Sequence, residues 1–353
     1  AVFRTNEHAL QAKMTDCVSF AYTPEQVWCF TADPPAEHSP GLEFVEKNDQ
    51  IEMTGCQLEP QWNLLRTRSR PRNYIDEFTW EDSVQPTIYI VDTYMQTDNP
   101  DFGGRASLGF RILDDGKFQA HGTHVGGTAG SWTFGLAKQS RLVSVQVLNN
   151  QGSGLWSDLI KGLSYISMRE KNSNRTNVVN ISISGPYNYV TNLAVNRLVQ
   201  QGLVVVVAGG NDSHDACANS PGSAELAITV ASSGHNDNFS TFSNYGRCID
   251  IIAPGESILS IVPAGRTDYM SGTSMASPLV AGIAAMYLAM PGMSQTSPAK
   301  IKDIIVSTAT KNYVRGSPYG TPNLLPYYKD QSICPAEHEM VDLLDMLYFQ
   351  AQI

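Results

Sequence analysis

Five short runs of apolar, largely β-branched residues recur through the middle of the chain, with longer helical stretches between them. The runs do not alternate apolar with polar residues, which is typical of strands buried on both faces of a sheet. A strand, a crossover helix and another strand, repeated in this way, predict an α/β fold with a mostly parallel β-sheet flanked by helices on both faces. The runs cover residues 87–91, 142–148, 178–183, 203–207 and 226–231.

The chain has 353 residues, which is long enough for one large domain with smaller additions. Residues 1–56 differ from the rest, because they hold three of the six cysteines, a Pro-Pro pair and little glycine. We therefore expect a separate segment at 1–56, a main domain at 57–330 and a carboxy-terminal tail at 331–353.

Composition and charge exclude several classes of protein. Hydrophobic residues make up 42% of the chain and charged residues 16%, which is typical of a globular protein and not of a disordered one. The formal net charge of -10 gives no attraction to nucleic acid or to an anionic membrane. No stretch approaches the roughly 18 uninterrupted apolar residues of a membrane span. We expect neither nucleic acid nor a membrane as a partner.

Polar residues follow the apolar runs, at the strand ends where parallel sheets bind their ligands. Asp92 comes directly after the first run, and Asn211 follows the fourth run through two glycines. His121 begins a stretch of small residues that suits a closely packed helix. Ser274 lies at the start of an apolar helix, where free N–H groups and the helix dipole stabilise negative charge. The set provides a hydroxyl, a base, a carboxylate and an amide that can donate to an oxyanion.

Each of these residues also has a simpler structural interpretation. An Asp after a strand commonly caps a turn, and a Ser before a helix commonly caps that helix. His121 is compatible with a packed core residue or, together with His124, with half of a metal site. Their spacing differs from that of the HExxH zinc motif, however, and we predict no metal site there. The joint occurrence of Asp, His, Asn and Ser in this order favours a catalytic set.

With these motifs the sequence resembles the subtilisin-like serine proteases, and most closely their proteinase K-like branch. The resemblance extends over residues 62–328, which is most of the chain. The motifs that carry it are Asp92-Thr93, His121-Gly122-Thr123-His124, Ala208-Gly209-Gly210-Asn211, Phe242-Ser243-Asn244-Tyr245-Gly246, Ala253-Pro254-Gly255 and Gly272-Thr273-Ser274-Met275-Ala276.

The resemblance implies a serine endopeptidase that hydrolyses peptide bonds. Ser274 would attack the peptide carbonyl, His121 would take and return the proton, and Asp92 would fix the imidazole tautomer. Asn211 and the backbone N–H of Ser274 would hold the oxyanion. Trp156 falls where the family often has an aromatic residue in a distant subsite, and the alternative is a surface aromatic. The substrate-binding residues that the family implies are Gly152, Ser153, Gly154, Trp156, Ser182, Ile183, Ser184, Gly185, Ala208, Gly209 and Gly210.

Four positions depart from the family pattern, namely Tyr94, Ala120, Ser184 and Leu279, and two of them bear on the shape of the site. Tyr94 stands where Gly usually follows Asp-Thr, and we expect its bulk to crowd the loop of Asp92 or to force a different turn. Ser184 replaces the first Gly of the substrate-binding pair, and we expect it to narrow the cleft. An alternative function is therefore a protease-fold binding protein that is blocked by its pro-segment or is weakly active. A lipase or esterase is disfavoured, because the GxSxG motif is missing and the order of the catalytic residues differs.

The resemblance also implies a partial propeptide at the amino terminus. Residues 41–49 resemble the last strand of a subtilisin propeptide, and residues 60–66 resemble the start of a mature enzyme. We expect a zymogen that is processed between Asn48 and Pro60, with protein or peptide substrates and its own pro-segment as partners. An unrelated extension is the alternative. Possible glycosylation sequons at Asn174 and Asn238 agree with a secreted or lumenal protein, extracellular or vacuolar.

The resemblance implies one disulfide, and it raises the question of a calcium site. Cys217 and Cys248 flank segments that converge in the family's fold, so we expect them to form a disulfide. Proteinase K-like enzymes often bind calcium through an aspartate just after the strand that matches residues 226–231. This chain has Gly234 there, and glycine offers no carboxylate. We expect no cofactor, and a calcium site that is weak or empty.

Overall fold

The chain divides into two compact units, residues 1–53 and 54–353. The structure is a computed structural model that describes residues 19–23, 26–30, 44–47, 54–58, 60–69, 77–81, 86–113 and 117–328. The division falls before the boundary predicted after Cys56, because residues 54–58 form a strand of the larger unit. The predicted tail, 331–353, lies outside the described residues.

The smaller unit contains a three-stranded antiparallel sheet. Strand β1 (Ser19–Thr23) lies between β2 (Gln26–Phe30) and β3 (Phe44–Lys47). Strand β3 falls within residues 41–49, the stretch that resembles the last strand of a subtilisin propeptide.

The larger unit is built on a seven-stranded sheet with the order β14-β13-β11-β9-β6-β8-β7, in which every pair of neighbours is parallel. The predicted parallel sheet is confirmed, and the five apolar runs form its five inner strands. The two edge strands were not predicted, because no residue of β7 is fully buried and β14 has only four residues. The strands are β6 (Thr87–Asp92), β7 (Ala106–Arg111), β8 (Arg141–Gln146), β9 (Val178–Ile181), β11 (Val204–Ala208), β13 (Ile228–Ser233) and β14 (Ile251–Pro254).

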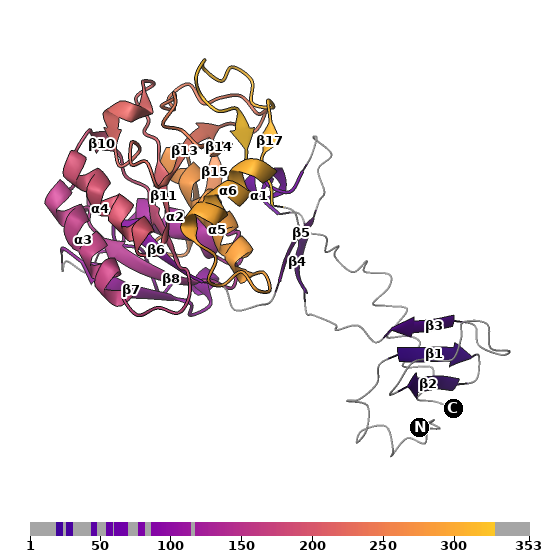
Figure 1. The fold of residues 1–353 in the computed structure, drawn as a ribbon. Helices are drawn as coiled ribbons and strands as arrows, with labels where there is room; N and C mark the ends of the chain where they lie inside the picture. The colour runs from indigo at the N-terminus through magenta and orange to yellow at the C-terminus, as the bar shows by residue number, and fades with distance from the viewer. Residues whose placement is uncertain are drawn as a thin grey trace. The chain divides into compact units, whose positions relative to one another are not determined.

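Helices cover both faces of this sheet (Figure 1). Ile88 and Ile90 of β6 belong to one apolar cluster, with residues of α2 (Ala120–Gly130), α5 (Thr273–Ala289) and α6 (Pro298–Thr308). Tyr89 and Val91, on the other face, pack in a second cluster with α3 (Trp156–Arg169) and α4 (Tyr189–Gln200). None of the helices in the described part of the chain has the length and apolar character that a membrane crossing needs.

Helix α5 is the central helix, and its residues 273–288 are all buried. It packs directly on α2. A Cβ atom at Gly282 would lie 2.8 Å from the Cβ atom of Leu136 and 3.1 Å from the carbonyl oxygen of Ala129, so the close approach requires glycine.

Short elements complete the larger unit. They are the antiparallel pairs β4 (Thr54–Leu58) with β5 (Glu77–Glu81), β10 (Gly185–Pro186) with β12 (Asn219–Ser220), β15 (Ile258–Val262) with β16 (Arg266–Met270), and β17 (Thr310–Lys311) with β18 (Leu324–Leu325), together with helix α1 (Trp62–Arg66) and the 3₁₀ turns η2 (Pro100–Phe102) and η3 (Ala216–Ala218).

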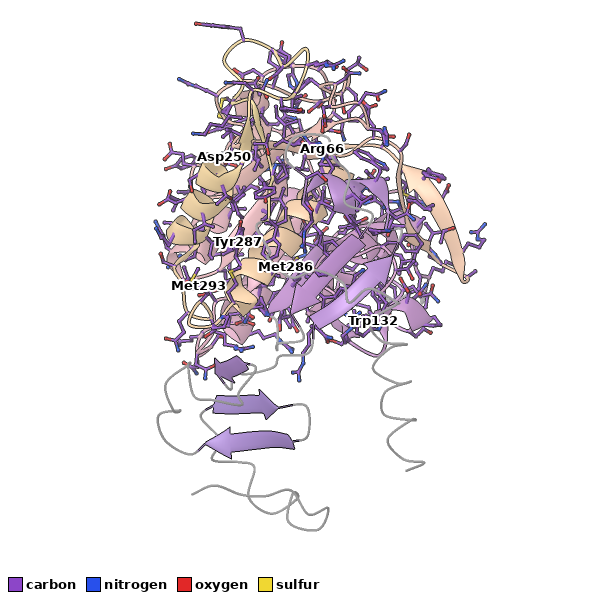
Figure 2. The ribbon with its side chains drawn as sticks, turned by 90° about the vertical axis from the view of Figure 1, so that its right-hand side faces the viewer. Arg66, Trp132, Asp250, Met286, Tyr287 and Met293 are labelled. Carbon is purple, nitrogen blue, oxygen red and sulfur yellow. A yellow bond between two sulfur atoms is a disulfide. The ribbon has the colours of Figure 1, made fainter. Side chains whose placement is uncertain are left out.

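A buried ion pair fixes α1 against a distant loop. The Nε atom of Arg66 donates to Oδ1 of Asp237 at 2.6 Å, and both side chains are less than 5% exposed. The Nη1 atom of Arg66 donates to the carbonyl of Ser69, and the guanidinium lies 5.3 Å from the ring centroid of Tyr313. Arg66 is labelled in Figure 2, which shows it among the side chains of the larger unit.

We predict that Asp237→Asn lowers the free energy of unfolding by about 3–5 kcal/mol, because it leaves the Arg66 charge buried without a counter-charge. Urea unfolding in a Ser274→Ala background would measure this without self-digestion. Asp158→Asn is the matched control: its pair with Lys161 is exposed, and its loss is expected to cost about 1 kcal/mol or less. Equal losses in the two variants would contradict the prediction.

Candidate active site

Asp92 and His121 form a direct pair. Asp92 ends β6 and is fully buried, and His121 is the second residue of α2. The Nδ1 atom of His121 lies 2.8 Å from Oδ1 and 3.0 Å from Oδ2 of Asp92, and Oδ1 also accepts from the N–H of Thr93 at 2.6 Å. Because a carboxylate only accepts, Nδ1 carries the proton, and Nε2 is left as the ring atom that can take another.

The two histidines of the motif have opposite pKa shifts. Burial by itself lowers the pKa of His121, but the charge of Asp92 and its hydrogen bond outweigh burial, and the pKa is raised above 6.5. Burial lowers the pKa of His124 to about 4, and its Nε2 atom donates to the carbonyl of Ile258 at 2.9 Å. The described residues contain no group of three His, Cys, Asp or Glu side chains that could hold a metal ion.

Ser274 is the second residue of α5 and lies in the same pocket as His121. Its side chain is 9% exposed, and its hydroxyl donates to the carbonyl of Ser182 at 3.2 Å. The hydroxyl thus bonds to the residue that directly follows β9 in this structure. Catalytic hydrogen bonds are often long or misaligned until substrate binds, so the arrangement is compatible with a nucleophile and its base.

A buried polar network holds the backbone of Ser274. In a regular helix the N–H of residue 278 would donate to the Ser274 carbonyl, but residue 278 is proline and has no N–H. Ser182 Oγ donates to this carbonyl at 2.9 Å, and it lies 2.9 Å from Ser277 Oγ and from the amide nitrogen of Asn180. Ser182 and Ser274 therefore bind each other twice, each hydroxyl to the other residue's carbonyl. Sequence reasoning missed Asn180 and Ser277, although Pro278 signals the free carbonyl.

Asn211 is oriented by Thr273. Its Oδ1 atom accepts from the N–H of Thr273 at 2.8 Å and from the Thr273 hydroxyl at 2.9 Å, which leaves the NH₂ group on the opposite side. Gly210, just before it, has φ +105°, and a Cβ there would lie 2.2 Å from the amide nitrogen of Asn244. Glycine is therefore required at this turn. The amide of Asn211 and the start of α5 lie together, as an oxyanion site requires.

Residues 152–154 and 182–185 of the predicted substrate-binding segments line two pockets that share Leu148, Gly152, Ile183 and Ser184, whereas residues 208–210 line neither of them. The first pocket is lined by Thr93, Gln119, Ala120, His121, Leu148, Asn150, Gln151, Gly152, Ser182, Ile183, Ser184 and Ser274. The second is lined by Val147, Leu148, Gly152, Ser153, Gly154, Leu155, Trp156, Leu159, Ile183, Ser184, Gly185 and Pro186.

Trp156 and the loop of residues 208–211 both lie close to Ser184 and Gly185, which line the second pocket. The Trp156 ring lies against Gly185, where a Cβ would be 2.9 Å from its Cζ2 atom. Ala208 ends β11, and Gly209 and Gly210 lead from it to Asn211. A Cβ at Gly210 would lie 2.8 Å from the hydroxyl of Ser184, so this loop and residues 182–185 approach each other closely.

Tyr94 and Ser184, which depart from the family pattern, fit without strain. Tyr94 has no positive φ, so its backbone does not need glycine. Its ring is buried, 4.8 Å from the Phe118 ring centroid, and its carbonyl accepts from the N–H of Gln119. The hydroxyl of Ser184 accepts from the amide of Asn219 at 3.0 Å. Tyr94 therefore packs beside the Asp92 loop and leaves the Asp92–His121 pair intact.

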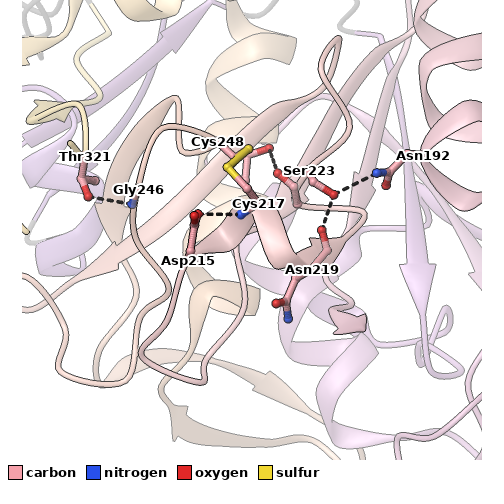
Figure 3. The surroundings of a disulfide bond; sticks show 10 residues. Asn192, Asp215, Cys217, Asn219, Ser223, Gly246, Cys248 and Thr321 are labelled. Atoms are coloured by element: carbon pink, nitrogen blue, oxygen red, sulfur yellow. Dashed lines mark hydrogen bonds between the residues drawn. A yellow bond between two sulfur atoms is a disulfide. The ribbon is translucent and has the colours of Figure 1, made fainter. Parts of the chain in front are cut away.

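A disulfide joins Cys217 and Cys248, whose Cα atoms are 5.3 Å apart (Figure 3). Cys217 lies in η3, in the loop that follows Asn211, and its N–H donates to Asp215 Oδ1 at 2.9 Å. The bridge ties this loop to the chain around Gly246, whose N–H donates to the Thr321 hydroxyl.

Comparison with known proteins identifies the family. Residues 86–323 match the subtilase family. The chain belongs to this family. It is a serine-type endopeptidase, and the resemblance to the proteinase K-like branch is confirmed. Each of the relatives described below is named as a protease or proteinase.

The chain is 41% identical over 299 residues to a cuticle-degrading protease of Metarhizium anisopliae. The alignment covers 82% of this chain and 76% of that protease. It is 38% identical over 295 residues to Proteinase R of Parengyodontium album, covering 82% and 75%. The crystal structure of a cold adapted subtilisin-like serine proteinase superposes with a TM-score of 0.72 at 34% identity, covering 77% of this chain and all of that one. The predicted subtilisin-like fold is thus confirmed.

We predict that kcat/KM of this subtilase rises with pH and reaches half its maximum above pH 6.5. His121 must be neutral to accept a proton, and Asp92 raises its pKa. In Asp92→Asn the charge is lost while burial remains, so the midpoint should move down, and kcat should fall by about 10⁴-fold, as it does in other serine proteases that lose this carboxylate. The pH–rate profiles of both enzymes test this, and an unchanged midpoint would assign the titration to another group.

Ser182→Ala should lower kcat about tenfold with little change in KM, because the Ser274 carbonyl and the Asn180 amide both lose their hydrogen-bond partner beside Ser274. Ser277→Ala is the matched control: it leaves the Ser182–Ser274 bonds in place and should have a smaller effect. The single-turnover rate of acylation separates this from a binding effect. Equal acylation rates in Ser182→Ala and the wild type would show that the network does not position the nucleophile.

Proposed function

We propose that Asp92, His121 and Ser274 form the catalytic triad of this endopeptidase, with Asn211 in the oxyanion hole. The Oγ atom of Ser274 bonds to the peptide carbonyl carbon while its proton passes to Nε2 of His121. The negative oxygen of the tetrahedral intermediate accepts from the Asn211 amide and the Ser274 N–H. His121 then gives the proton to the leaving amine, and water repeats the sequence to release the acyl group.

The observation that carries this proposal is the two-oxygen contact between Asp92 and the Nδ1 atom of His121, in one pocket with Ser274. A buried carboxylate in this position stabilises the imidazolium that forms during each proton transfer. Without it, burial alone would lower the pKa of His121 and weaken the base.

We propose that the peptide substrate binds as an added strand along residues 152–154 and 182–185. The carbonyl of Ser182, which holds the Ser274 hydroxyl at 3.2 Å, is then an acceptor for a substrate N–H. Substrate binding would release the hydroxyl toward His121. The second pocket, with Leu148, Leu155 and Trp156 in its lining, suits an apolar substrate side chain.

The remaining expectations from the sequence stay part of this proposal. Residues 1–56 act as a partial pro-segment, and the protease is secreted or lumenal. The Cys217–Cys248 disulfide supports an oxidising compartment, and the sequon residues Asn174 and Asn238 are exposed. The relative from Metarhizium is named for degrading cuticle. Nucleic acid and membranes have no part in the proposal.

We predict that a fluorophosphonate reagent forms one adduct, on Ser274, with loss of fluoride from phosphorus and of the serine proton to His121. Peptide mapping by mass spectrometry locates the adduct. Ser274→Ala should carry none, and Asn211→Ala should lose about 10²- to 10³-fold in kcat, the loss measured for this donor in subtilisin. A folded wild-type chain without an adduct on Ser274 would overturn the assignment of the nucleophile.

A further inference from the structure

The first turn of α4 has polar side chains on its inner side and apolar side chains on its outer side. Thr191 and Asn192 are buried, whereas Tyr189, Val190 and Leu193 are 62%, 58% and 47% exposed. A surface helix normally has the reverse arrangement, with its apolar side chains toward the core. The later turns of α4 follow that normal arrangement, because their buried residues are apolar. The inversion is therefore confined to the start of the helix.

The inner, polar side of this turn is held by hydrogen bonds. Asn188 caps the helix, since its Oδ1 atom accepts from the N–H of Thr191 at 2.9 Å. The amide of Asn192 donates to the hydroxyl of Ser223 at 2.8 Å, and its Oδ1 atom lies 2.8 Å from the hydroxyl of Ser220. The exposed apolar side chains thus stand on a backbone that is fixed from below. A surface that is ordered in advance loses little conformational entropy when it binds a partner.

The exposed apolar surface continues directly from the second pocket. Gly185 and Pro186 of β10 line that pocket. The N–H of Tyr187 donates to the carbonyl of Ala218 at 3.0 Å, which extends the pairing of β10 with β12 by one residue. Side chains alternate along a strand, so Tyr187 lies on the same face as Gly185, the face that the Trp156 ring contacts. Tyr187 is 55% exposed, so an open apolar surface begins where the pocket lining ends.

We call Tyr187, Tyr189, Val190 and Leu193 the α4 patch. Together they expose roughly 400 Å², about half of what each partner contributes to a typical stable protein interface. The patch is thus too small to hold a second folded protein alone. Exposed apolar clusters of this size commonly mark binding sites. A peptide that already occupies the neighbouring pocket can bind there without a further loss of translational freedom.

We propose that the α4 patch is an exosite for apolar residues of protein substrates, beyond the residue that fills the second pocket. The protease thereby favours extended apolar polypeptides over short peptides. This inference rests on the proposed function, because it takes the two pockets as the substrate cleft. No residue of the patch lines either pocket, so substitutions in the patch leave the cleft and the catalytic residues in place.

The test uses fluorogenic peptides of two lengths. A core peptide of about six residues spans the cleft, since an extended chain rises roughly 3.3 Å per residue. Longer peptides add four residues to one end of this core or to the other, and the added residues are either Leu and Phe or Gly and Ser. Comparing the two additions separates an apolar contact from an effect of length.

Two double variants are compared with the wild-type chain. Tyr189→Ala/Leu193→Ala removes half of the patch, and alanine at both helical positions keeps α4 stable. Tyr319→Ala/Met168→Ala is the matched control, because it removes one tyrosine and one aliphatic side chain that are 104% and 72% exposed. Met168 lies in the last turn of α3, at the opposite end from Trp156. Titration with a fluorophosphonate counts the active molecules in each preparation, so a poorly folded variant is not mistaken for a weakly binding one.

In the wild-type chain, the apolar addition at one of the two ends should raise kcat/KM about tenfold over the Gly-Ser addition at the same end. This gain should fall below about twofold in Tyr189→Ala/Leu193→Ala and remain in the control, because only the first variant lacks the contact surface. All three enzymes should cleave the core peptide with kcat/KM values within about twofold of one another.

Three results would overturn the exosite. The apolar additions could give no gain in the wild-type chain, or the gain could survive in Tyr189→Ala/Leu193→Ala. The wild-type chain could also sediment as a dimer that this variant does not form, which would make the patch an interface between two copies. Failure of the proposed function has a different signature: the core peptide would then remain uncut, or Ser274→Ala would cut it at the same rate.

Discussion

Helix α5 is apolar on every side, and such a helix is stable only where other elements cover it completely. The sheet covers one side, and α2 approaches so closely on another that Gly282 is required at the contact. The amino terminus of α5 can therefore emerge only where strands end. Ser274 is placed there beside Ser182, which follows β9, and beside Asn211, which follows β11. The apolar covering of one helix thus fixes the position of Ser274, the proposed nucleophile.

The fold and the principal site residues could be predicted because both depend on local patterns. Unalternated apolar runs predict buried parallel strands, and the carboxyl ends of such strands meet at one edge, so Asp92 and Asn211 could be located from the residues alone. The edge strand β7 escaped prediction because an exposed strand lacks a continuous apolar run. The boundary after residue 53 escaped because it depends on the pairing of β4 with β5, a contact that short-range periodicity does not encode.

Other contacts were unpredictable because they join residues far apart in the chain. The double bond between Ser182 and Ser274 depends on how β9 meets α5, and the packing of Tyr94 depends on Phe118. Several positively charged side chains also have partners far away in the sequence. Arg66 and Lys302 are each matched by a carboxylate. Lys138 is fully buried and donates to the Trp132 carbonyl at 2.6 Å, and burial lowers its pKa to about 7 although the charge of Asp101 raises it.

The same balance between burial and counter-charge separates the two histidines of α2. His121 and His124 lie within one helical turn, and burial disfavours the charged form of both. His121 is hydrogen-bonded to the Asp92 carboxylate, whose charge reverses the direction of its pKa shift, whereas for His124 burial outweighs the charge of Asp268. His124 has a backbone carbonyl as its partner and stays neutral near pH 7. A single buried carboxylate at the end of β6 therefore decides which of two neighbouring imidazoles can take up a proton and serve as the base.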